Sequence, residues 1–321
     1  MTKEEQLEKH INNFHSNYVM RDLTRIKTGG VAEYFCEADT IEELINGVSG
    51  AITIKEDYMV LGEGSNVLFS DYGYKGLVIK NKTNNLAFLD EMSQIIVDSG
   101  VSLKRIVMES CSRELSGMEP YATIPGTIGG AVWSNINVFN VPITNFIKSA
   151  TILFPKADGD YKVLKKNRDW FEFETGINKL KKIQPKPIIL SLKLQLAQNK
   201  REDIWKKLSY YKKLGEKNFP LNQLNLKVFS SRYLDGKNDT ETIKNLREQK
   251  TKTKAFCLDR ENPKFINNYR KAKSQEIKDY IESIKSYIRE KQGIMLEESF
   301  EYFGNWDSMN LEKLEISDEE E

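Results

Sequence analysis

A glycine-rich segment at residues 62–66, Gly-Glu-Gly-Ser-Asn, has residue types that can bind an anionic group. Glycines let the backbone turn tightly and bring N–H groups close to an anion, and Ser65 and Asn66 add side-chain hydrogen bonds. The segment follows a short apolar run at residues 58–61, which predicts a strand. This arrangement suits a pyrophosphate, although it lacks the GxGxxG pattern of dinucleotide-binding folds and begins no clear helix. An ordinary strand-to-strand turn is the alternative.

A second glycine-rich segment lies at residues 124–131, inside a stretch without charged residues. A proline is followed there by three glycines within five residues, and these are Pro125, Gly126, Gly129 and Gly130. Such a segment can lie against a flat, largely apolar ring and offer backbone N–H groups to its polar edge. The alternative is a buried turn required by packing. Because the two segments lie about 60 residues apart in one half of the chain, together they favour a nucleotide-type cofactor.

The histidines and cysteines are poorly placed for metal or nucleophilic chemistry. Both histidines, His10 and His15, lie near the N-terminus, so we expect neither a zinc site nor a histidine-based nucleophile relay. Cys36, Cys111 and Cys257 are far apart and form no CxxC pattern. They are typical of reduced thiols that pack as small hydrophobic groups in a cytosolic protein.

The charge balance argues against a polyanion-binding surface made by bulk charge. The chain has 48 Lys and Arg against 47 Asp and Glu, a net charge of +1, so no nucleic-acid partner is expected. Residues 1–10 contain no apolar run of the kind found in a secretory signal. The uncharged stretch at residues 120–147 contains prolines, glycines and asparagines. These would break a helix and be costly in lipid, so we expect no membrane span and a cytoplasmic location.

Apolar periodicity predicts alternating strands and helices, with a shift in composition after about residue 148. The predicted strands are residues 58–61, 67–69, 77–79, 95–97, 150–154 and 188–196. The predicted helices are residues 103–112, 205–214 and 277–288, the last ended by Gly293.

Three segments lie in register with those of a known enzyme family. They are residues 24–35 (TRIKTGGVAEYF), 61–68 (LGEGSNVL) and 117–133 (GMEPYATIPGTIGGAVW). Their order and spacing resemble those of the MurB family, the FAD-dependent UDP-N-acetylenolpyruvoylglucosamine reductases of peptidoglycan synthesis. The resemblance implies an α+β fold, in which a two-part FAD-binding domain of the vanillyl-alcohol-oxidase type is followed by a smaller α+β substrate domain.

The resemblance also implies domain boundaries. We expect the FAD-binding domain at residues 1–148, with lobes of about 1–80 and 81–148. The expected substrate domain covers residues 149–304, and residues 305–321 form an acidic tail that we expect to be disordered.

In the family, the two glycine loops hold the FAD pyrophosphate and flank the flavin. By position, this role falls on Gly62, Glu63, Gly64, Ser65, Asn66, Pro125, Gly126, Thr127, Gly129, Gly130 and Asn135. The family reaction passes a hydride from NADPH through the flavin to the enolpyruvyl double bond of a UDP-sugar. A serine protonates the neighbouring carbon, and an arginine and a glutamate polarise the substrate carboxylate.

The positions that would carry this chemistry have changed. The family's arginine segment matches residues 173–176, where Glu174 would oppose an anionic substrate. The serine's position is occupied by Lys227, a poor acid at neutral pH because its ordinary pKa is about 10.4. Ser299 stands where the polarising glutamate belongs, and Glu298 beside it should point to the opposite face of a strand.

These changes favour a divergent member of the family with lost or changed activity. Asn135 is retained on the flavin side, but Ile136 and Asn137 add bulk at positions that are normally small. Removal of one transition-state donor typically costs about two to three orders of magnitude in rate. The expected ligands are FAD, NADPH if the chain is active, and a nucleotide-sugar substrate, with no metal; we expect a monomer.

Two alternatives stay open. The chain could be a genuine reductase whose active-site register differs from our alignment. It could also be a cofactor-free scaffold that reuses the fold, with the basic stretch at residues 244–254 and the acidic tail as docking surfaces. Charged runs of this kind are more often simply solvated surface.

Overall fold

The structure is a computed structural model. It describes residues 2–173, 178–220, 224–229, 242, 244–246, 254–270 and 272–306. The chain divides into two compact units, each built from separated segments. Unit 1 comprises Met1–Ser16, Tyr34–Ser65 and Gly76–Gln223, and unit 2 comprises Asn17–Glu33, Asn66–Lys75 and Leu224–Glu321.

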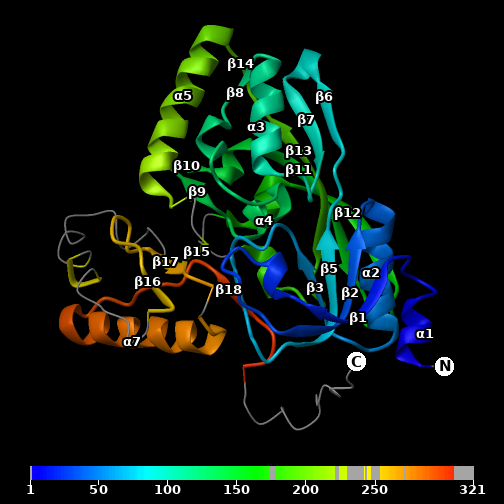
Figure 1. Ribbon diagram of the computed structural model, residues 1–321. Helices are drawn as coiled ribbons and strands as arrows, with labels where there is room; N and C mark the ends of the chain where they lie inside the picture. Colours follow the sequence, from blue (N-terminus) through cyan, green and yellow to red (C-terminus); the bar gives the residue numbers. More distant parts are fainter. Residues whose placement is uncertain are drawn as a thin grey trace, which may run out of the picture. The chain divides into compact units, whose positions relative to one another are not determined.

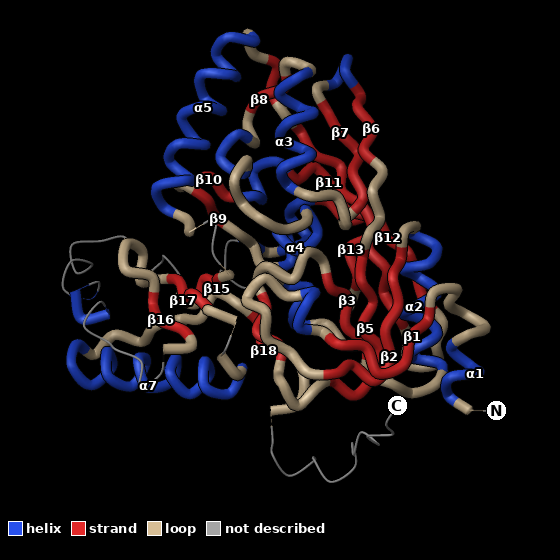
Figure 2. Tube along the Cα trace, viewed as in Figure 1, coloured by secondary structure: helices blue, strands red, loops and turns tan. Residues whose placement is uncertain are grey.

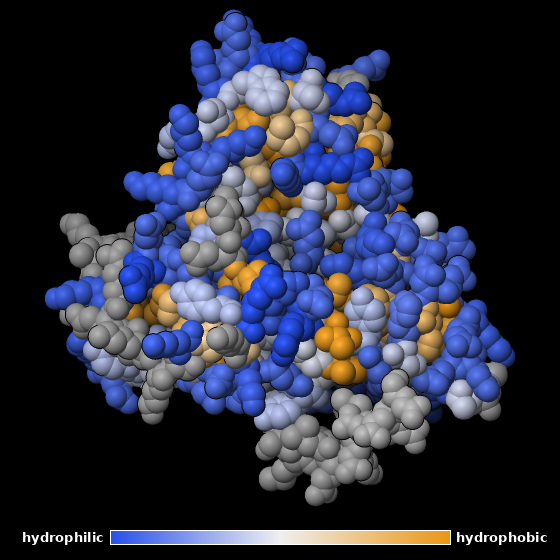
Figure 3. Space-filling view, in the orientation of Figure 1, coloured by the Kyte–Doolittle hydropathy of each residue, from blue (hydrophilic) through white to orange (hydrophobic). Residues whose placement is uncertain are grey.

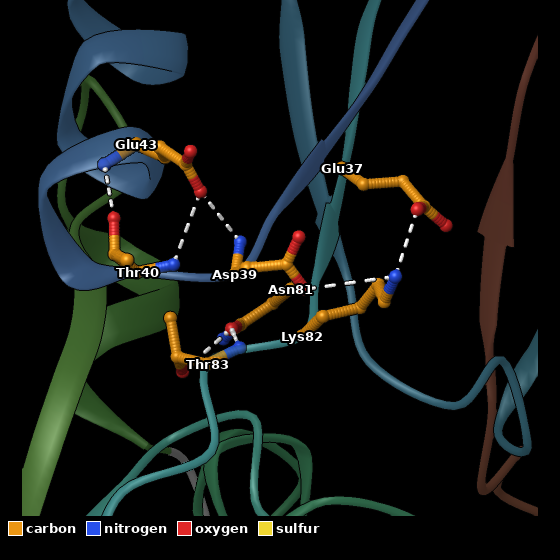
Figure 4. Close-up of polar contacts among 7 residues, drawn as sticks. All are labelled: Glu37, Asp39, Thr40, Glu43, Asn81, Lys82 and Thr83. Atoms are coloured by element: carbon orange, nitrogen blue, oxygen red, sulfur yellow. Dashed lines mark hydrogen bonds and ion pairs between the residues drawn. The ribbon is translucent and has the colours of Figure 1, made fainter. Parts of the chain in front are cut away.

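A four-stranded sheet, most of whose residues belong to unit 1, has the strand order β1-β2-β5-β3, with β3 and β5 parallel. Its elements and the helices beside it are α1 (Lys3–Leu7), β1 (Phe14–Val19), β2 (Val31–Ala38), α2 (Ile41–Thr53), β3 (Tyr58–Leu61) and β5 (Tyr74–Asn81). The helix α2 begins with a capping box, in which Thr40 and Glu43 each bond the other's backbone N–H (Figure 4). Its apolar face, including Leu44 and Val48, shares a core with Cys36 and Ile79 of the sheet.

A second, antiparallel sheet in unit 1 has the order β12-β11-β13-β7-β6 (Figure 2). Its strands are β6 (Leu86–Leu89), β7 (Gln94–Asp98), β11 (Ile147–Pro155), β12 (Tyr161–Asn167) and β13 (Ile188–Gln195). Strand β7 therefore pairs with β13, although the two lie on opposite sides of residue 148 in sequence. The backbone ladder and buried side chains such as Ile95 and Leu192 hold these strands together within the segment of unit 1 that runs from Gly76 to Gln223.

The remaining elements of unit 1 are short, apart from two helices that contact each other, α3 and α5 (Figure 1). The helices are α3 (Leu103–Ser112), α4 (Ile128–Trp133) and α5 (Arg201–Asn218), and the 3-10 turns are η2 (Asp90–Met92), η3 (Glu119–Tyr121), η4 (Ile143–Phe146), η5 (Arg168–Phe171) and η7 (Lys179–Lys182). The two-residue strands are β8 (Leu115–Ser116), β9 (Asn137–Val138), β10 (Val141–Pro142) and β14 (Ala197–Gln198). None of the helices in the described ranges is long and apolar enough to cross a membrane.

Unit 2 contains a three-stranded antiparallel sheet in the order β15-β17-β16 and a parallel pair, β18 and β4. Its elements are η1 (Arg21–Leu23), β4 (Val67–Phe69), β15 (Asn225–Lys227), β16 (Phe256–Leu258), β17 (Phe265–Asn268), α7 (Ser274–Gln292) and β18 (Glu301–Phe303). The predicted isoleucine stripe of α7 is fully buried, and it consists of Ile277, Ile281, Ile284 and Ile288. Gly293 ends this helix at φ +69°, as predicted.

The structure confirms the α+β class. The face seen in Figure 3 is largely hydrophilic, in agreement with a chain in which 30% of residues are charged. Residues 307–321, most of the predicted acidic tail, and residues 247–253 of the basic stretch lie outside the described ranges.

Candidate functional site

The first glycine loop begins where β3 ends, and it carries backbone N–H groups for which the described residues provide no acceptor. Gly64 is buried and has φ +65°, a left-handed conformation that favours glycine. Among the described residues, no acceptor is found for the backbone N–H groups of Glu63, Gly64 and Ser65. Glu63 is exposed and Ser65 is half-buried, whereas Gly64 is buried. Because buried backbone N–H groups are almost always hydrogen-bonded in folded proteins, the Gly64 N–H is suited to an anionic ligand.

The second glycine loop leads into the short helix α4. Thr127 precedes the helix, and its Oγ1 accepts a hydrogen bond from the Gly130 N–H over 3.3 Å. The Gly129 N–H donates to the carbonyl of Ser99 over 2.9 Å. Thr127 is itself buried, and its own N–H has no acceptor in the part of the chain that the structure describes. Of these three N–H groups, only that of Thr127 is therefore open to a ligand.

Hydrogen bonds join the two loops directly. The N–H of Gly126, a residue with φ +132°, donates to Glu63 Oε2 over 2.8 Å. The Ser65 hydroxyl donates to the Pro125 carbonyl over 3.1 Å. The structure therefore brings the two predicted segments together, so that N–H groups from both can face one ligand. Several N–H donors within one junction suit the negative charge of a diphosphate.

Two glycines are required at this junction because their neighbours lie very close. A Cβ at Gly62 would lie 2.7 Å from Thr127 Oγ1, and one at Gly129 would lie 2.7 Å from Ser99 Cβ. Separations this short do not occur without displacement of the neighbouring atoms. Gly130 is different, because its nearest atom, Thr127 Oγ1, would lie 3.4 Å from an added Cβ.

A polar network holds the turn against which Gly129 packs. The Asn81 amide donates to Ser99 Oγ over 2.8 Å, and its oxygen accepts from the Thr83 hydroxyl over 2.8 Å. The Thr83 Oγ1 in turn accepts from the Gly100 N–H over 3.1 Å. Figure 4 shows the Asn81–Thr83 contact at the end of β5. Sequence reasoning missed these residues; the only available signal was a run of polar residues directly after an apolar strand.

Two other predicted cofactor residues, Asn66 and Asn135, take no part in the two hydrogen bonds that join the glycine loops. Asn66 belongs to unit 2, where its carbonyl accepts from the Glu301 N–H over 3.1 Å. Asn135 follows α4 in unit 1, is half-buried, and has a left-handed φ of +46°. Ile136 packs against the hydrophobic core of unit 1, and the side chain of Asn137 is exposed.

The structure places Lys227 and Ser299, two of the three residues expected at catalytic positions, side by side in unit 2. The Ser299 hydroxyl donates to the Lys227 carbonyl over 2.8 Å, and the Ser299 N–H donates to the Val228 carbonyl over 3.1 Å. The third position, Glu174, lies outside the described residues. The hydroxyl of Ser299 is thus engaged with backbone, where the family has a carboxylate facing its substrate.

Glu298 is held by partners from elsewhere in unit 2. Its Oε1 accepts from Lys285 Nζ over 2.9 Å and from the Tyr302 hydroxyl over 3.1 Å. Burial, with the charge of Glu298, raises the pKa of Tyr302 well above its usual value, so the phenol stays protonated. Burial alone would lower the pKa of Lys285, but hydrogen bonds to Glu298 and Glu282 raise it overall. The carboxylate of Glu298 therefore forms an ion pair with Lys285.

Residues 24–33, most of the first matched segment, have a packing role within unit 2. A Cβ at Gly30 would lie 2.2 Å from the carbonyl oxygen of Asp71. The Gly29 N–H donates to Asp71 Oδ1 over 3.0 Å, and the Asp71 N–H donates to Ser274 Oγ over 2.8 Å. These contacts tie the segment to the start of α7.

The cysteines behave as predicted for buried thiols. Cys36 and Cys111 are free and belong to hydrophobic cores, and Cys257 is free and half-buried. Burial raises the pKa of Cys36 to about 12 and that of Cys111 to about 11. Within the described ranges, no group of three or more His, Cys, Asp and Glu residues is arranged to hold a metal ion.

Comparison with known proteins gives a consistent family resemblance. Residues 32–164, which include both glycine loops, match the family model described as FAD binding domain. The UDP-N-acetylenolpyruvoylglucosamine reductase of Caldicellulosiruptor saccharolyticus is 26% identical over 310 residues, covering 96% of this chain and 97% of the relative. The reductase of Bacillus pumilus is 32% identical over 226 residues, covering 69% and 71%.

A solved structure shares the fold over nearly the whole chain. It is the crystal structure of UDP-N-acetylenolpyruvylglucosamine reductase (MurB) from Thermus caldophilus, with a TM-score of 0.72 and 20% sequence identity. The match covers 90% of this chain and 98% of that one. At this level of identity, the likeness concerns the fold alone.

Proposed function

The chain belongs to the UDP-N-acetylenolpyruvoylglucosamine reductase family and is an FAD-binding flavoprotein. We therefore propose that its two glycine loops hold the diphosphate of FAD. The observation that carries this proposal is the direct bonding of the loops beside N–H groups without acceptors among the described residues. Four glycines allow the backbone of the two loops to approach the diphosphate closely, and these are Gly62, Gly64, Gly126 and Gly129. When bound, FAD supplies hydride-transfer chemistry.

Individual residues of the predicted set have different roles in this proposal. The N–H groups of Glu63, Gly64, Ser65 and Thr127 contact the diphosphate. The Glu63 carboxylate and the Ser65 hydroxyl hold the second loop in place. Pro125 supplies a carbonyl to this junction. The Gly130 N–H, inside α4, bonds the capping Thr127, and Asn135 gives the chain a left-handed turn after the helix. Asn66 has a different place, because its carbonyl accepts from the Glu301 N–H within unit 2.

The substrate of this chain is proposed to be a nucleotide sugar, because its relatives are named for reduction of UDP-N-acetylenolpyruvoylglucosamine. NADPH is the proposed reductant. We assign substrate handling to the part of the expected 149–304 domain that lies in unit 2, from Leu224 onward. The protein is proposed to be a monomer of the cytoplasm, where free thiols such as Cys36 and Cys111 persist.

The family reaction is proposed to be lost or changed. Lys227 has no hydroxyl to deliver a proton, and its ammonium is a weak acid at neutral pH. Ser299 carries no charge and donates its hydroxyl to backbone, so it polarises no substrate carboxylate. A one-residue shift that used Glu298 would first have to break its ion pair with Lys285. The genuine-reductase alternative is therefore less well supported, and the match to the FAD binding domain argues against a cofactor-free scaffold.

Anaerobic turnover measurements test this proposal. The purified protein is saturated with FAD and mixed with NADPH and UDP-N-acetylenolpyruvoylglucosamine, and NADPH oxidation is followed with the Bacillus pumilus reductase as reference. We expect a rate at least about 100-fold below the reference. A rate within tenfold of the reference would establish a genuine reductase and overturn the proposal of changed activity.

A further inference from the structure

Lys80 lies beside the first glycine loop and contacts its backbone. It stands near the end of β5, directly opposite Leu61 of the parallel strand β3, and is half-buried. Its Nζ donates a hydrogen bond to the carbonyl oxygen of Gly62 over 2.5 Å. A cation on one strand is thus bonded to the first residue of the loop that leaves the neighbouring strand.

The carbonyl that Lys80 contacts belongs to the peptide group joining Gly62 to Glu63. This peptide is trans, so its C=O and N–H bonds point in opposite directions. The bond from Lys80 to the Gly62 oxygen therefore directs the Glu63 N–H away from the ammonium. No described residue accepts from that N–H. Hydrogen bonding to the oxygen also polarises the same peptide and strengthens its N–H as a donor.

We infer that Lys80 is a positioning residue for the diphosphate of FAD. It fixes the orientation of the Gly62–Glu63 peptide and places a positive charge behind the loop, on the side opposite the N–H that faces the ligand. The inference rests on the proposed assignment of this loop to the diphosphate. A side chain at position 80 without a donor would remove both the hydrogen bond to the Gly62 carbonyl and the positive charge.

The chain offers a matched control two residues along. Lys82 is exposed and pairs with Glu37 at 2.8 Å and Asp39 at 3.6 Å, as Figure 4 shows. The variants are Lys80→Met, Lys80→Gln, Lys80→Arg and Lys82→Met. Each is freed of flavin, its melting temperature is measured, and its Kd for FAD is determined by fluorescence titration at low and at high salt.

We expect Lys80→Met to raise the Kd for FAD by at least about tenfold, and its affinity to depend less on salt than that of the wild type. Lys80→Gln keeps a hydrogen-bond donor without the charge, so its Kd for FAD should lie between those of wild type and Lys80→Met. Lys80→Arg should stay within about threefold of wild type, and Lys82→Met within about twofold.

The outcomes separate the inference from the proposed function. If the wild-type protein takes up no FAD, the loop assignment itself fails. If wild type binds FAD and folded Lys80→Met binds it within twofold, only the inference on Lys80 is overturned. Equal losses in Lys80→Met and Lys82→Met would also overturn it, because they would indicate a general charge effect. Should Lys80→Met not fold, Lys80→Gln decides in the same way.

Discussion

The hydroxyl of Ser299 donates a hydrogen bond to the backbone carbonyl of Lys227 over 2.8 Å. These residues are 72 positions apart, and each occupies a place where the family resemblance calls for a catalytic group. Their adjacency supports the alignment of both segments with the family. Sequence similarity alone is too weak in this half of the chain to support that alignment. The side chains found there differ in charge and in proton-donor strength from a serine and a glutamate.

Restoring the family residues at these two positions should raise reductase activity. We predict that the double variant Lys227→Ser with Ser299→Glu turns over UDP-N-acetylenolpyruvoylglucosamine at least about tenfold faster than wild type in the NADPH assay. Loss of the Ser299 hydroxyl should cost about 1 kcal/mol of stability. Ser299→Ala serves as the control and should show no gain. A folded, FAD-bound double variant no faster than wild type would contradict the assigned roles.

Gly129 should be indispensable for retention of the flavin. We predict that Gly129→Val loses FAD during purification, because its Cβ would displace Ser99 and break the bond from the Gly129 N–H. Gly130→Ala, where the added methyl meets only an ordinary contact, should retain FAD within a few-fold of the wild-type ratio. The ratio of flavin to protein absorbance measures both. Equal retention in the two variants would count against the role of Gly129.

The carboxylate of Glu63 should act through its hydrogen bond and not through its charge. Glu63→Ala leaves the Gly126 N–H without its acceptor and uncouples the loops, so the Kd for FAD should rise about tenfold. Glu63→Gln keeps an acceptor and removes a negative charge near the diphosphate, so it should bind FAD at least as tightly as wild type. Fluorescence titration distinguishes the two. Weaker binding of FAD by Glu63→Gln than by Glu63→Ala would contradict a role of Glu63 through its hydrogen bond to Gly126.

Strong local patterns made several elements predictable from sequence. The helix at residues 103–112 and the strands at residues 58–61 and 67–69 were predicted with the bounds that the structure shows. A ligand-binding role for the glycine segments could be predicted because glycine lets the backbone turn tightly and approach a ligand closely. Their direct bonding could not be predicted, since the bond from Gly126 to Glu63 joins residues 63 positions apart.

Other features depend on contacts distant in sequence. The compact units interleave because residues 17–33 and 66–75 group with residues from 224 onward, as in the pairing of β4 with β18. Within unit 1, β7 pairs with β13 across residue 148, and the shift in composition after that residue gives no sign of this pairing. The helix α4 lies in a Pro- and Gly-rich segment whose local propensity opposes a helix. Residues such as Asn81 and Thr83 support the site only through a turn formed by Ser99 and Gly100.

Stability should fall at alkaline pH because buried groups hold their protons in the folded state. Burial raises the pKa of Cys111 to about 11, and that of Cys36 and Tyr280 to about 12, from ordinary values of 9.0 for the thiols and 10.0 for the phenol. Unfolding therefore releases protons above about pH 9, and stability that is complete below that pH is lost as the pH rises toward 12. We predict a free energy of unfolding at least about 1 kcal/mol lower at pH 10 than at pH 7, by urea titration.

The paired variant Cys36→Ala with Cys111→Ala provides the control for that titration. It should show a smaller difference between the two pH values than wild type, although it is less stable at both because two small cavities form. An unchanged difference would mean that these thiols do not cause the alkaline loss.

A crystal structure of the protein soaked or co-crystallised with FAD tests directly whether the two glycine loops hold the diphosphate. We expect the diphosphate oxygens to accept hydrogen bonds from the backbone N–H groups of Glu63, Gly64, Ser65 and Thr127. A diphosphate bound elsewhere on the chain, or crystals of a protein that takes up no flavin, would contradict this role of the loops.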